Sequence, residues 1–284
     1  MISFVNAKLN LGLSVVRKRE DGYHDLETIF IPAGELCGLP HEPGTLCDIL
    51  EMVPAAADSF ETLGADAGCP LEQNLVWRAL QSFRRAFPEA QPVRIILDKR
   101  LPSGAGMGGG SADAGFALRM LNEINGSPLS ATQLAEIARS LGADVPFFLY
   151  NRPCFATGIG ERLTPLEIPQ LRGKTALILK PSEGISTAQA FANITPHPAK
   201  VKLTEAIRLP IEQWRALIVN DFEAAMFRIH PHLIHIKEYL YGSGALYASM
   251  TGSGSAFFGI YADREAALSA LEGASTAFAT IINL

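Results

Sequence analysis

The sequence predicts an α+β fold with two lobes, because the chain is long, mixes two apolar periodicities and has one unpatterned stretch past its midpoint. At 284 residues it exceeds the usual size of a single domain, so its hydrophobic core is expected to divide. Strand-like and helix-like patterns of apolar residues occur in both halves. Residues 163–173 follow neither pattern and contain two prolines and a glycine. We therefore expect one lobe over residues 1–162 and another over residues 163–284.

The first lobe is expected to start with extended segments. Apolar residues alternate from Leu9 to Val15. Ser111 is placed to cap a helix that starts there. Further along the chain, Ser130 and Gln133 have the spacing of a capping box at the start of another helix. The expected strands are residues 9–15, 24–31, 93–97 and 147–150, and the expected helices are residues 74–87, 111–124 and 130–142. No element is predicted for residues 38–70.

The second lobe is expected to mix strands and helices in the same way. Its expected strands are residues 175–179, 247–251, 256–261 and 278–284, with several helices between residues 186 and 241 and one from Asp263.

Composition excludes several classes of function. Hydrophobic residues make up 48% of the chain and charged residues 19%, as in an ordinary globular protein. The net charge is −5, and the nearest approach to a basic cluster, Lys18, Arg19, Arg84 and Arg85, has acidic neighbours, so no nucleic-acid partner is expected. No apolar run approaches the roughly 18 residues that cross a bilayer. We expect a cytoplasmic protein that does not bind membranes.

The four cysteines do not form a recognisable metal or disulfide pattern. Cys37, Cys47, Cys69 and Cys154 include no C-x-x-C pair and no histidine at metal-ligand spacing. Reduced thiols and no metal site are therefore expected. Polar residues near the start of the chain also argue against a signal peptide.

A glycine-rich loop between a predicted strand and a predicted helix is the strongest chemical signal. Its residues are Pro102, Ser103, Gly104, Ala105, Gly106, Met107, Gly108, Gly109, Gly110, Ser111 and Ala112. Glycines let backbone N–H groups converge on an anion at a helix N-terminus, so the loop is typical of a polyphosphate site. A glycine turn without a ligand is the alternative.

Other nucleotide-binding motifs fit this loop poorly. Gly104, Gly106 and Gly109 match the dinucleotide fingerprint, but a second helix follows where that fold needs a strand ending in an acid. Gly110 stands where a P-loop has its lysine. The H-R-D and D-F-G motifs of protein kinases are absent.

Taken together, segments along the whole chain resemble the GHMP superfamily of small-molecule kinases. They are Ala7 to Leu11, Asp21 to His24 leading into Leu26 to Phe30, Asn74 to Val76, Lys99 to Pro102 with the glycine loop, Gly142 to Pro146, Gly158 to Glu161, Asn220 to Glu223 and Thr251 to Ser255. The Asp-Gly-Tyr-His segment is the most discriminating, because other GHMP kinases share the glycine loop but lack it. Ala105 and Met107 depart from the usual loop, and residues 31–73 match poorly.

The resemblance implies a two-lobed GHMP fold with the active site between an N-terminal ATP-binding domain and a C-terminal domain. It implies ATP as co-substrate, accompanied by Mg²⁺. The glycine loop would hold the ATP, with Asn74 and Lys99 near the adenine. Asp144 would be the base that takes the alcohol proton. Lys8 would keep that carboxylate ionised and neutralise charge on the transferring phosphoryl group. Without the resemblance, Asp144 would pass for a turn aspartate and Lys8 for a surface lysine.

The acceptor implied by the resemblance is a small cytidine diphosphate alcohol of non-mevalonate isoprenoid synthesis. Tyr23 and a second-lobe aromatic would stack on the cytosine, with His24 at its edge and Asn10 near the alcohol. Phe191 is the best-placed second aromatic, although it fits a core position equally well. A GHMP kinase for mevalonate or homoserine is the first alternative, and an inactive binding protein is the second. The residues that would bind cytosine argue against a kinase for mevalonate or homoserine. The presence of Lys8 and Asp144 argues against an inactive binding protein. The sequence does not indicate an oligomeric state.

Overall fold

The computed structural model describes residues 1–34, 46–65 and 68–284, and within these residues the strands form two sheets. The first sheet has seven strands in the order β4-β5-β3-β1-β2-β6-β7, and the second has four in the order β11-β8-β10-β9. The first contains β1 (Ile2–Lys18), β2 (His24–Ala33), β3 (Cys47–Pro54), β4 (Ser59–Gly64), β5 (Val93–Lys99), β6 (Cys154–Thr157) and β7 (Arg162–Pro165). The second contains β8 (Thr175–Lys180), β9 (Tyr247–Met250), β10 (Phe257–Tyr261) and β11 (Phe278–Asn283).

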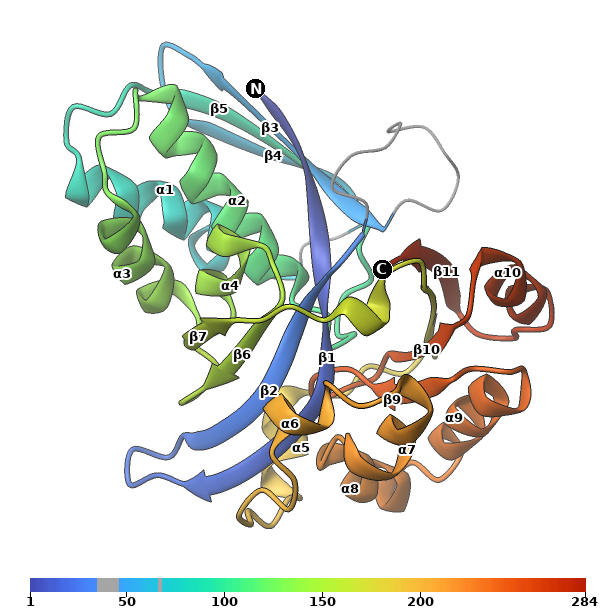
Figure 1. Ribbon diagram of the computed structural model, residues 1–284. Coiled ribbons are helices and arrows are strands. Elements are labelled where there is room, and N and C mark those ends of the chain that lie inside the picture. The colour runs from blue at the N-terminus through green and yellow to red at the C-terminus, as the bar shows by residue number, and fades with distance from the viewer. Residues whose placement is uncertain (35–45, 66–67) are drawn as a thin grey trace.

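Helices cover one face of the first sheet and pack around the second (Figure 1). Those on the first sheet are α1 (Leu75–Ala86), α2 (Gly109–Ile124), α3 (Ala131–Leu141) and α4 (Val145–Tyr150). The others are α5 (Thr187–Ala192), α6 (Leu203–Ala206), α7 (Trp214–Leu217), α8 (Phe222–Ile229), α9 (Leu233–Gly242) and α10 (Arg264–Glu272). Short 3-10 helices span Leu71–Gln73, Pro169–Leu171 and Ile211–Gln213. None of the helices described is long and apolar enough to span a bilayer.

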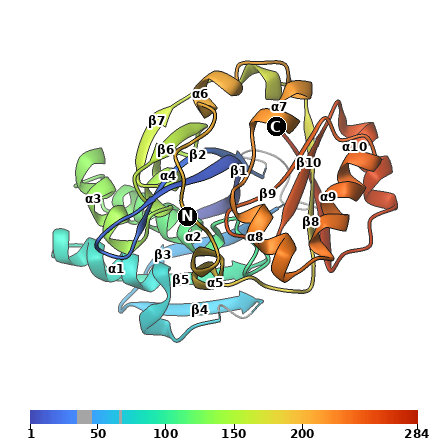
Figure 2. The ribbon, with the colours of Figure 1, turned by 90° about the horizontal axis from the view of Figure 1, so that it is seen from below.

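The long strand β1 is the central strand of the first sheet, between β3 and β2 (Figure 2). Its first residues pair with β3, and residues 7–18 pair with β2. Residues 5–15 are buried throughout, because one lobe packs against the strand from each side. Leu13 also hydrogen-bonds the segment before α8: its N–H donates to the Val219 carbonyl at 2.9 Å and its carbonyl accepts from the Asp221 N–H at 2.8 Å. The residues of β1 therefore have fixed positions relative to both lobes.

Most elements lie where the sequence places them, including the capping box at Ser130 and the helix end at Gly142. The expected strand over residues 147–150 is wrong, because this segment belongs to helix α4. A short apolar run does not distinguish a strand from a buried helix, and Pro146 in the first turn favours the helix. Ser111 does not cap α2 either: that helix begins at Gly109, after Gly108 in a left-handed conformation.

Four strands escaped the sequence analysis, namely β3, β4, β6 and β7. Both β3 and β4 lie within residues 38–70, for which no element was expected. Strand β3 is buried at the middle of the sheet, whereas β4 is a largely exposed edge strand of mainly polar sequence. Residues 35–45 and 66–67, including Cys37, lie outside the described residues. The chain leaves the first sheet with β7, which starts at residue 162, and enters the second with β8 at residue 175.

The capping box of α3 gives a test of the local structure. Replacing Ser130 with alanine removes the acceptor of the Gln133 N–H and should lower the free energy of unfolding by about 1 kcal/mol. The matched control is Ser140→Ala in the last turn of the same helix, which removes a serine without a capping role. Urea unfolding of both variants measures the difference, and equal stabilities would contradict the capping role.

Candidate active site

A cleft of about 790 Å³ lies between the two lobes and contains nearly all the residues that the sequence singled out. Of these, only Ala112 is not among its lining residues, because it is buried in α2. The walls come from β1, β2, the glycine loop, the start of α4, and from Phe191, Phe222 and Gly252 in the second lobe. Residues distant in sequence therefore meet in one cavity.

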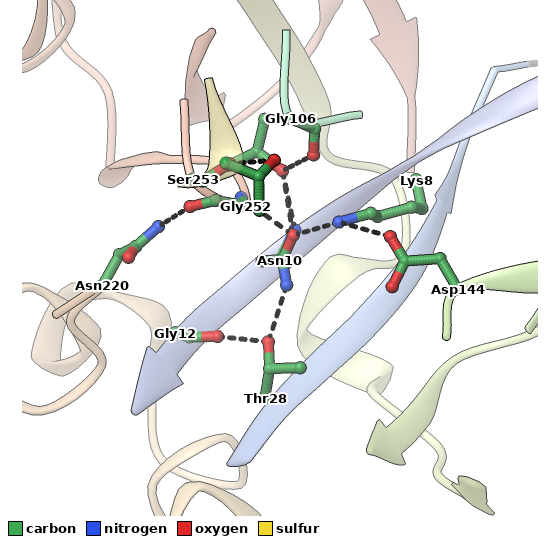
Figure 3. Close-up of polar contacts among 11 residues, drawn as sticks. Lys8, Asn10, Gly12, Thr28, Gly106, Asp144, Asn220, Gly252 and Ser253 are labelled. Atoms are coloured by element: carbon green, nitrogen blue, oxygen red, sulfur yellow. Dashed lines mark hydrogen bonds and ion pairs between the residues drawn. The ribbon is translucent and has the colours of Figure 1, made fainter. Parts of the chain in front are cut away.

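Lys8 and Asp144 form an ion pair within the cleft (Figure 3). The Lys8 Nζ lies 3.5 Å from Asp144 Oδ2 and donates to Asn10 Oδ1 at 2.7 Å. It also lies 4.9 Å from the centre of the Phe30 ring. The lysine side chain is 5% exposed and the aspartate side chain 31%, so the ammonium is held inside while the carboxylate can reach a ligand.

The direction of the Asp144 carboxylate is set by the start of a helix. Val145 and Pro146 belong to α4, and Asp144 is its N-cap residue with helical backbone angles. Its side chain makes no capping hydrogen bond. The carboxylate thus faces Lys8 across the cleft instead of closing its own helix end.

Asn10, which the resemblance places near the alcohol, is hydrogen-bonded to protein at both ends of its amide. Its Oδ1 accepts from Lys8 Nζ and from the Gly252 N–H at 2.9 Å, and its Nδ2 donates to Thr28 Oγ1 at 2.9 Å. Its backbone N–H donates to Thr251 Oγ1 at 3.1 Å. The residue is 1% exposed. Its position therefore determines where the Lys8 ammonium lies.

The glycine loop packs against the second glycine cluster, Thr251 to Ser255. The Ser255 N–H donates to the Gly104 carbonyl and the Ala256 N–H to the Ala105 carbonyl, both at 3.2 Å. Gly106 has a φ of +73°, and a Cβ there would lie 2.2 Å from the Thr251 carbonyl oxygen. Only glycine permits this approach. The loop leads into the N-terminus of the sixteen-residue helix α2, whose first N–H groups can bind phosphate oxygens.

Two expected nucleotide-binding residues have structural partners as well. The Asn74 side chain accepts from the Val76 N–H at 2.9 Å and caps α1. Lys99 Nζ donates to Asp113 Oδ2 at 2.8 Å and contacts Asp48, whose other oxygen accepts the N–H groups that follow Lys99. Sequence reasoning missed both aspartates, although an aspartate within an apolar helix such as α2 is a signal of a buried charge.

The charges around Lys99 are strongly coupled. Burial raises the pKa of Asp113 to about 8, against the opposing effect of the Lys99 charge. Burial by itself would lower the pKa of Lys99, but the two carboxyl groups outweigh it and raise that pKa. Lys99 is therefore a cation held between two acids at one wall of the cleft.

Aromatic rings gather at another end of the cleft. The rings of His24 and Phe191 are stacked with centroids 4.8 Å apart and an interplanar angle of 25°. Phe222, which sequence reasoning missed, meets the Phe191 ring edge-on at 4.9 Å. Tyr23 is 60% exposed next to them. Burial, with the Lys18 charge acting in the same direction, lowers the pKa of His24, so its ring is neutral at pH 7.

The cleft offers few ligands for a metal ion. Asp113 and Asp144 are the carboxylates among the described residues that line it, and Asp113 is bound to Lys99. Across the described ranges, no group of three or more His, Cys, Asp or Glu side chains is arranged to hold a metal. A divalent cation in this cleft would have to bind chiefly to the phosphates of a nucleotide.

Comparisons with known proteins find matches to one family in both halves of the chain. Residues 74–152 match the GHMP kinases N terminal domain and residues 203–280 match the GHMP kinases C terminal domain. The chain is 43% identical to the 4-diphosphocytidyl-2-C-methyl-D-erythritol kinase of Parabacteroides distasonis over 261 residues, which covers 92% of each protein. It is 44% identical to the protein of that name from Bacteroides thetaiotaomicron over 265 residues, again 92% of each.

A solved structure supports the same assignment. The crystal structure of a 4-(cytidine 5'-diphospho)-2C-methyl-D-erythritol kinase is 33% identical, has a TM-score of 0.81, and the match covers 99% of this chain and 98% of that one. The expected α+β fold of the GHMP kinases is therefore confirmed.

The carboxyl groups beside Lys99 predict how stability varies with pH. The folded protein holds a proton on Asp113 between about pH 4 and pH 8 that the unfolded chain releases, so this group's contribution to the free energy of unfolding falls as pH rises through that range. In Asp113→Asn the contribution is absent, and stability should fall less steeply from pH 6 to pH 8. Urea unfolding at pH 6, 7 and 8 compares the two proteins, and equal slopes would refute the raised pKa.

Proposed function

Because this chain belongs to the 4-diphosphocytidyl-2-C-methyl-D-erythritol kinase family of GHMP kinases, we propose that it phosphorylates the 2-hydroxyl group of that compound. The phosphoryl donor is ATP, and the products are the 2-phosphate and ADP. The observation that carries the proposal is that one cleft holds the Lys8–Asp144 pair, a glycine loop and an aromatic pocket. These are the parts needed to transfer a phosphoryl group to a base-bearing alcohol.

The transfer itself requires little covalent chemistry from the protein. The substrate hydroxyl oxygen forms a bond to the γ-phosphorus while the bond from that phosphorus to the β,γ-bridging oxygen breaks, which releases ADP. The hydroxyl proton passes to the Asp144 carboxylate, which lies at the cleft surface with one oxygen facing Lys8. In-line attack places the acceptor alcohol on the Asp144 side of the glycine loop.

Lys8 is suited to stabilise the charge that develops on the phosphoryl oxygens. An ammonium group has three N–H donors, of which one is directed to Asn10 and another can serve Asp144. We assign the third to the transferring phosphoryl group. Because Lys8 is buried, this interaction is stronger than it would be in bulk water.

The aromatic end of the cleft is suited to a cytosine base. We assign Tyr23 and Phe191 to its two faces and the neutral His24 ring to its hydrogen-bonding edge. In this structure the His24 ring is stacked on Phe191, so His24 covers a face of the Phe191 ring. His24 would then turn toward the edge of the base as Phe191 receives its face. Phe222 supports Phe191 from the other side.

The remaining assignments follow from the donor. The glycine loop with the α2 N-terminus binds the ATP phosphates, and Asn74 and Lys99 line the part of the cleft given to adenine. Mg²⁺ bound to those phosphates would neutralise charge during transfer. We further propose that residues 1–162 and 163–284 are the two domains, and that the enzyme works in the cytoplasm in non-mevalonate isoprenoid precursor synthesis.

A direct assay tests the proposal. The protein is incubated with Mg²⁺ and ATP together with 4-diphosphocytidyl-2-C-methyl-D-erythritol, mevalonate or homoserine, and mass spectrometry scores the phosphorylated product. We expect product from the cytidine compound alone. Product from mevalonate or homoserine instead would assign another GHMP kinase activity, and no product from any alcohol would favour a binding protein.

The base assigned to Asp144 can be tested by substitution. Asp144→Asn should keep the fold and ATP binding and lower kcat by roughly 10²- to 10⁴-fold, which is the usual contribution of general acid–base catalysis. Steady-state kinetics and ATP titration measure the two effects. Turnover near that of the wild type would remove Asp144 from this role.

The cytosine pocket gives another prediction. CDP should compete with the alcohol substrate and not with ATP. His24→Ala should raise the KM for the alcohol by about 5- to 150-fold, because a lost hydrogen bond to a buried base costs about 1 to 3 kcal/mol. The KM for ATP should stay unchanged. The control is His235→Ala on the exposed surface of α9, and competition of CDP with ATP alone would argue against the pocket.

A further inference from the structure

We propose that Asn220 is a positioning residue for the kinase reaction, which fixes the Lys8 ammonium through Gly252 and Asn10; this inference rests on the proposed function. Asn220 precedes α8 and is 2% exposed. Both hydrogens of its Nδ2 are used: it donates to the carbonyls of Met250 and Gly252, each at 2.8 Å. Its Oδ1 accepts from the Phe222 N–H at 3.0 Å.

Along the chain, the Met250 and Gly252 carbonyls that Asn220 binds flank the groups that contact Asn10. Gly252 donates its N–H to Asn10 Oδ1 at 2.9 Å, and Thr251 Oγ1 accepts the Asn10 N–H at 3.1 Å. Asn10 Oδ1 in turn accepts from Lys8 Nζ at 2.7 Å. Figure 3 shows these contacts as one connected path from Asn220 to Lys8 and Asp144.

Two residues of the glycine cluster, Gly252 and Gly254, have no side chain that could fix the backbone. Gly252 has a φ of +55°, and a Cβ there would lie 2.6 Å from the Gly106 carbonyl oxygen, so no larger side chain can be used at this point. A backbone rich in glycine samples many conformations unless other groups hold it. The Asn220 amide supplies two of the hydrogen bonds that do so.

Asn220 is itself held by the strand that carries the reacting group. The residues on either side of it, Val219 and Asp221, hydrogen-bond to Leu13 of β1. Lys8 and Asn10 lie on the same strand. The path from β1 through Asn220 and Gly252 back to Asn10 is therefore closed, and it fixes the second lobe's glycine cluster relative to the lysine.

An isosteric substitution tests this role. Asn220→Asp keeps the shape of the side chain but replaces the two N–H donors with an oxygen facing two carbonyl oxygens. We expect kcat to fall by roughly 10- to 100-fold, since a small misplacement of a catalytic group has effects of this size. The KM values for both substrates should change less than about threefold, because neither the glycine loop nor the aromatic pocket loses a group.

Matched variants separate positioning from general stability. Asn122 is also a buried asparagine that bridges backbone groups, here the N–H and carbonyl of Leu129, but outside the cleft. Asn122→Asp should lower the melting temperature and leave kcat within twofold of the wild type. If Asn220→Asp does not fold, Asn220→Ser, which keeps one donor, carries the comparison and should show a smaller fall in kcat.

A double-mutant cycle decides whether Asn220 acts through Lys8. In a Lys8→Ala background, Asn220→Asp should lower kcat by less than about twofold further, because the group that it positions is gone. An equal fold loss in both backgrounds, or a wild-type kcat in folded Asn220→Asp, would overturn the proposal. The cycle is run with whichever alcohol the wild-type protein phosphorylates, so failure of the cytidine substrate would contradict the proposed function and leave this comparison intact.

Discussion

The hydrogen bonds at Asn10 Oδ1 are the interaction on which the rest of the site depends. This one oxygen accepts from Lys8 on its own strand and from Gly252 in the other lobe. An ammonium group on a four-carbon stem has high rotamer entropy, so it needs such a partner to keep one position. Because the partner also binds the second lobe, the lysine is placed only when both lobes are packed on β1. The packing of the two lobes on β1 therefore also sets the position of the Lys8 ammonium.

The buried charges of Lys8 and Lys99 are compensated differently. Lys8 has one neutral acceptor and one partly exposed carboxylate, which leaves its charge available to a ligand. Lys99 lies between Asp48 and Asp113, and this buried group of charges is matched within the protein. A buried cation with two carboxyl partners has little attraction left for phosphate. This difference supports a role for Lys8 in transfer and a structural role for Lys99 in shaping the cleft wall.

The sequence predicted the parts of the fold and site that depend on local chemistry. The glycine loop and the capping box at Ser130 belong to this group, whereas the cleft positions of Lys8 and Asp144 were implied by the resemblance to GHMP kinases. Helix α4 was mistaken for a strand because short apolar runs carry no period, and edge strand β4 has too few apolar residues to show one. The contacts of Asn220 with Gly252 could not be predicted, since they depend on how residues 32 positions apart are folded together.

The separation between the aromatic pocket and the transfer centre has a consequence for specificity. The rings that would read the base come from the turn after β1, from α5 and from α8, whereas Lys8 lies within β1 and Asp144 at the start of α4. Tyr23 and His24 lie at a hairpin end where backbone changes leave the sheet register near Lys8 intact. The acceptor pocket can thus differ between related kinases while the ion pair and the glycine loop keep their geometry. Asn220 and Phe222 are the link between the two regions, because one residue fixes the glycine cluster and the other supports the Phe191 ring.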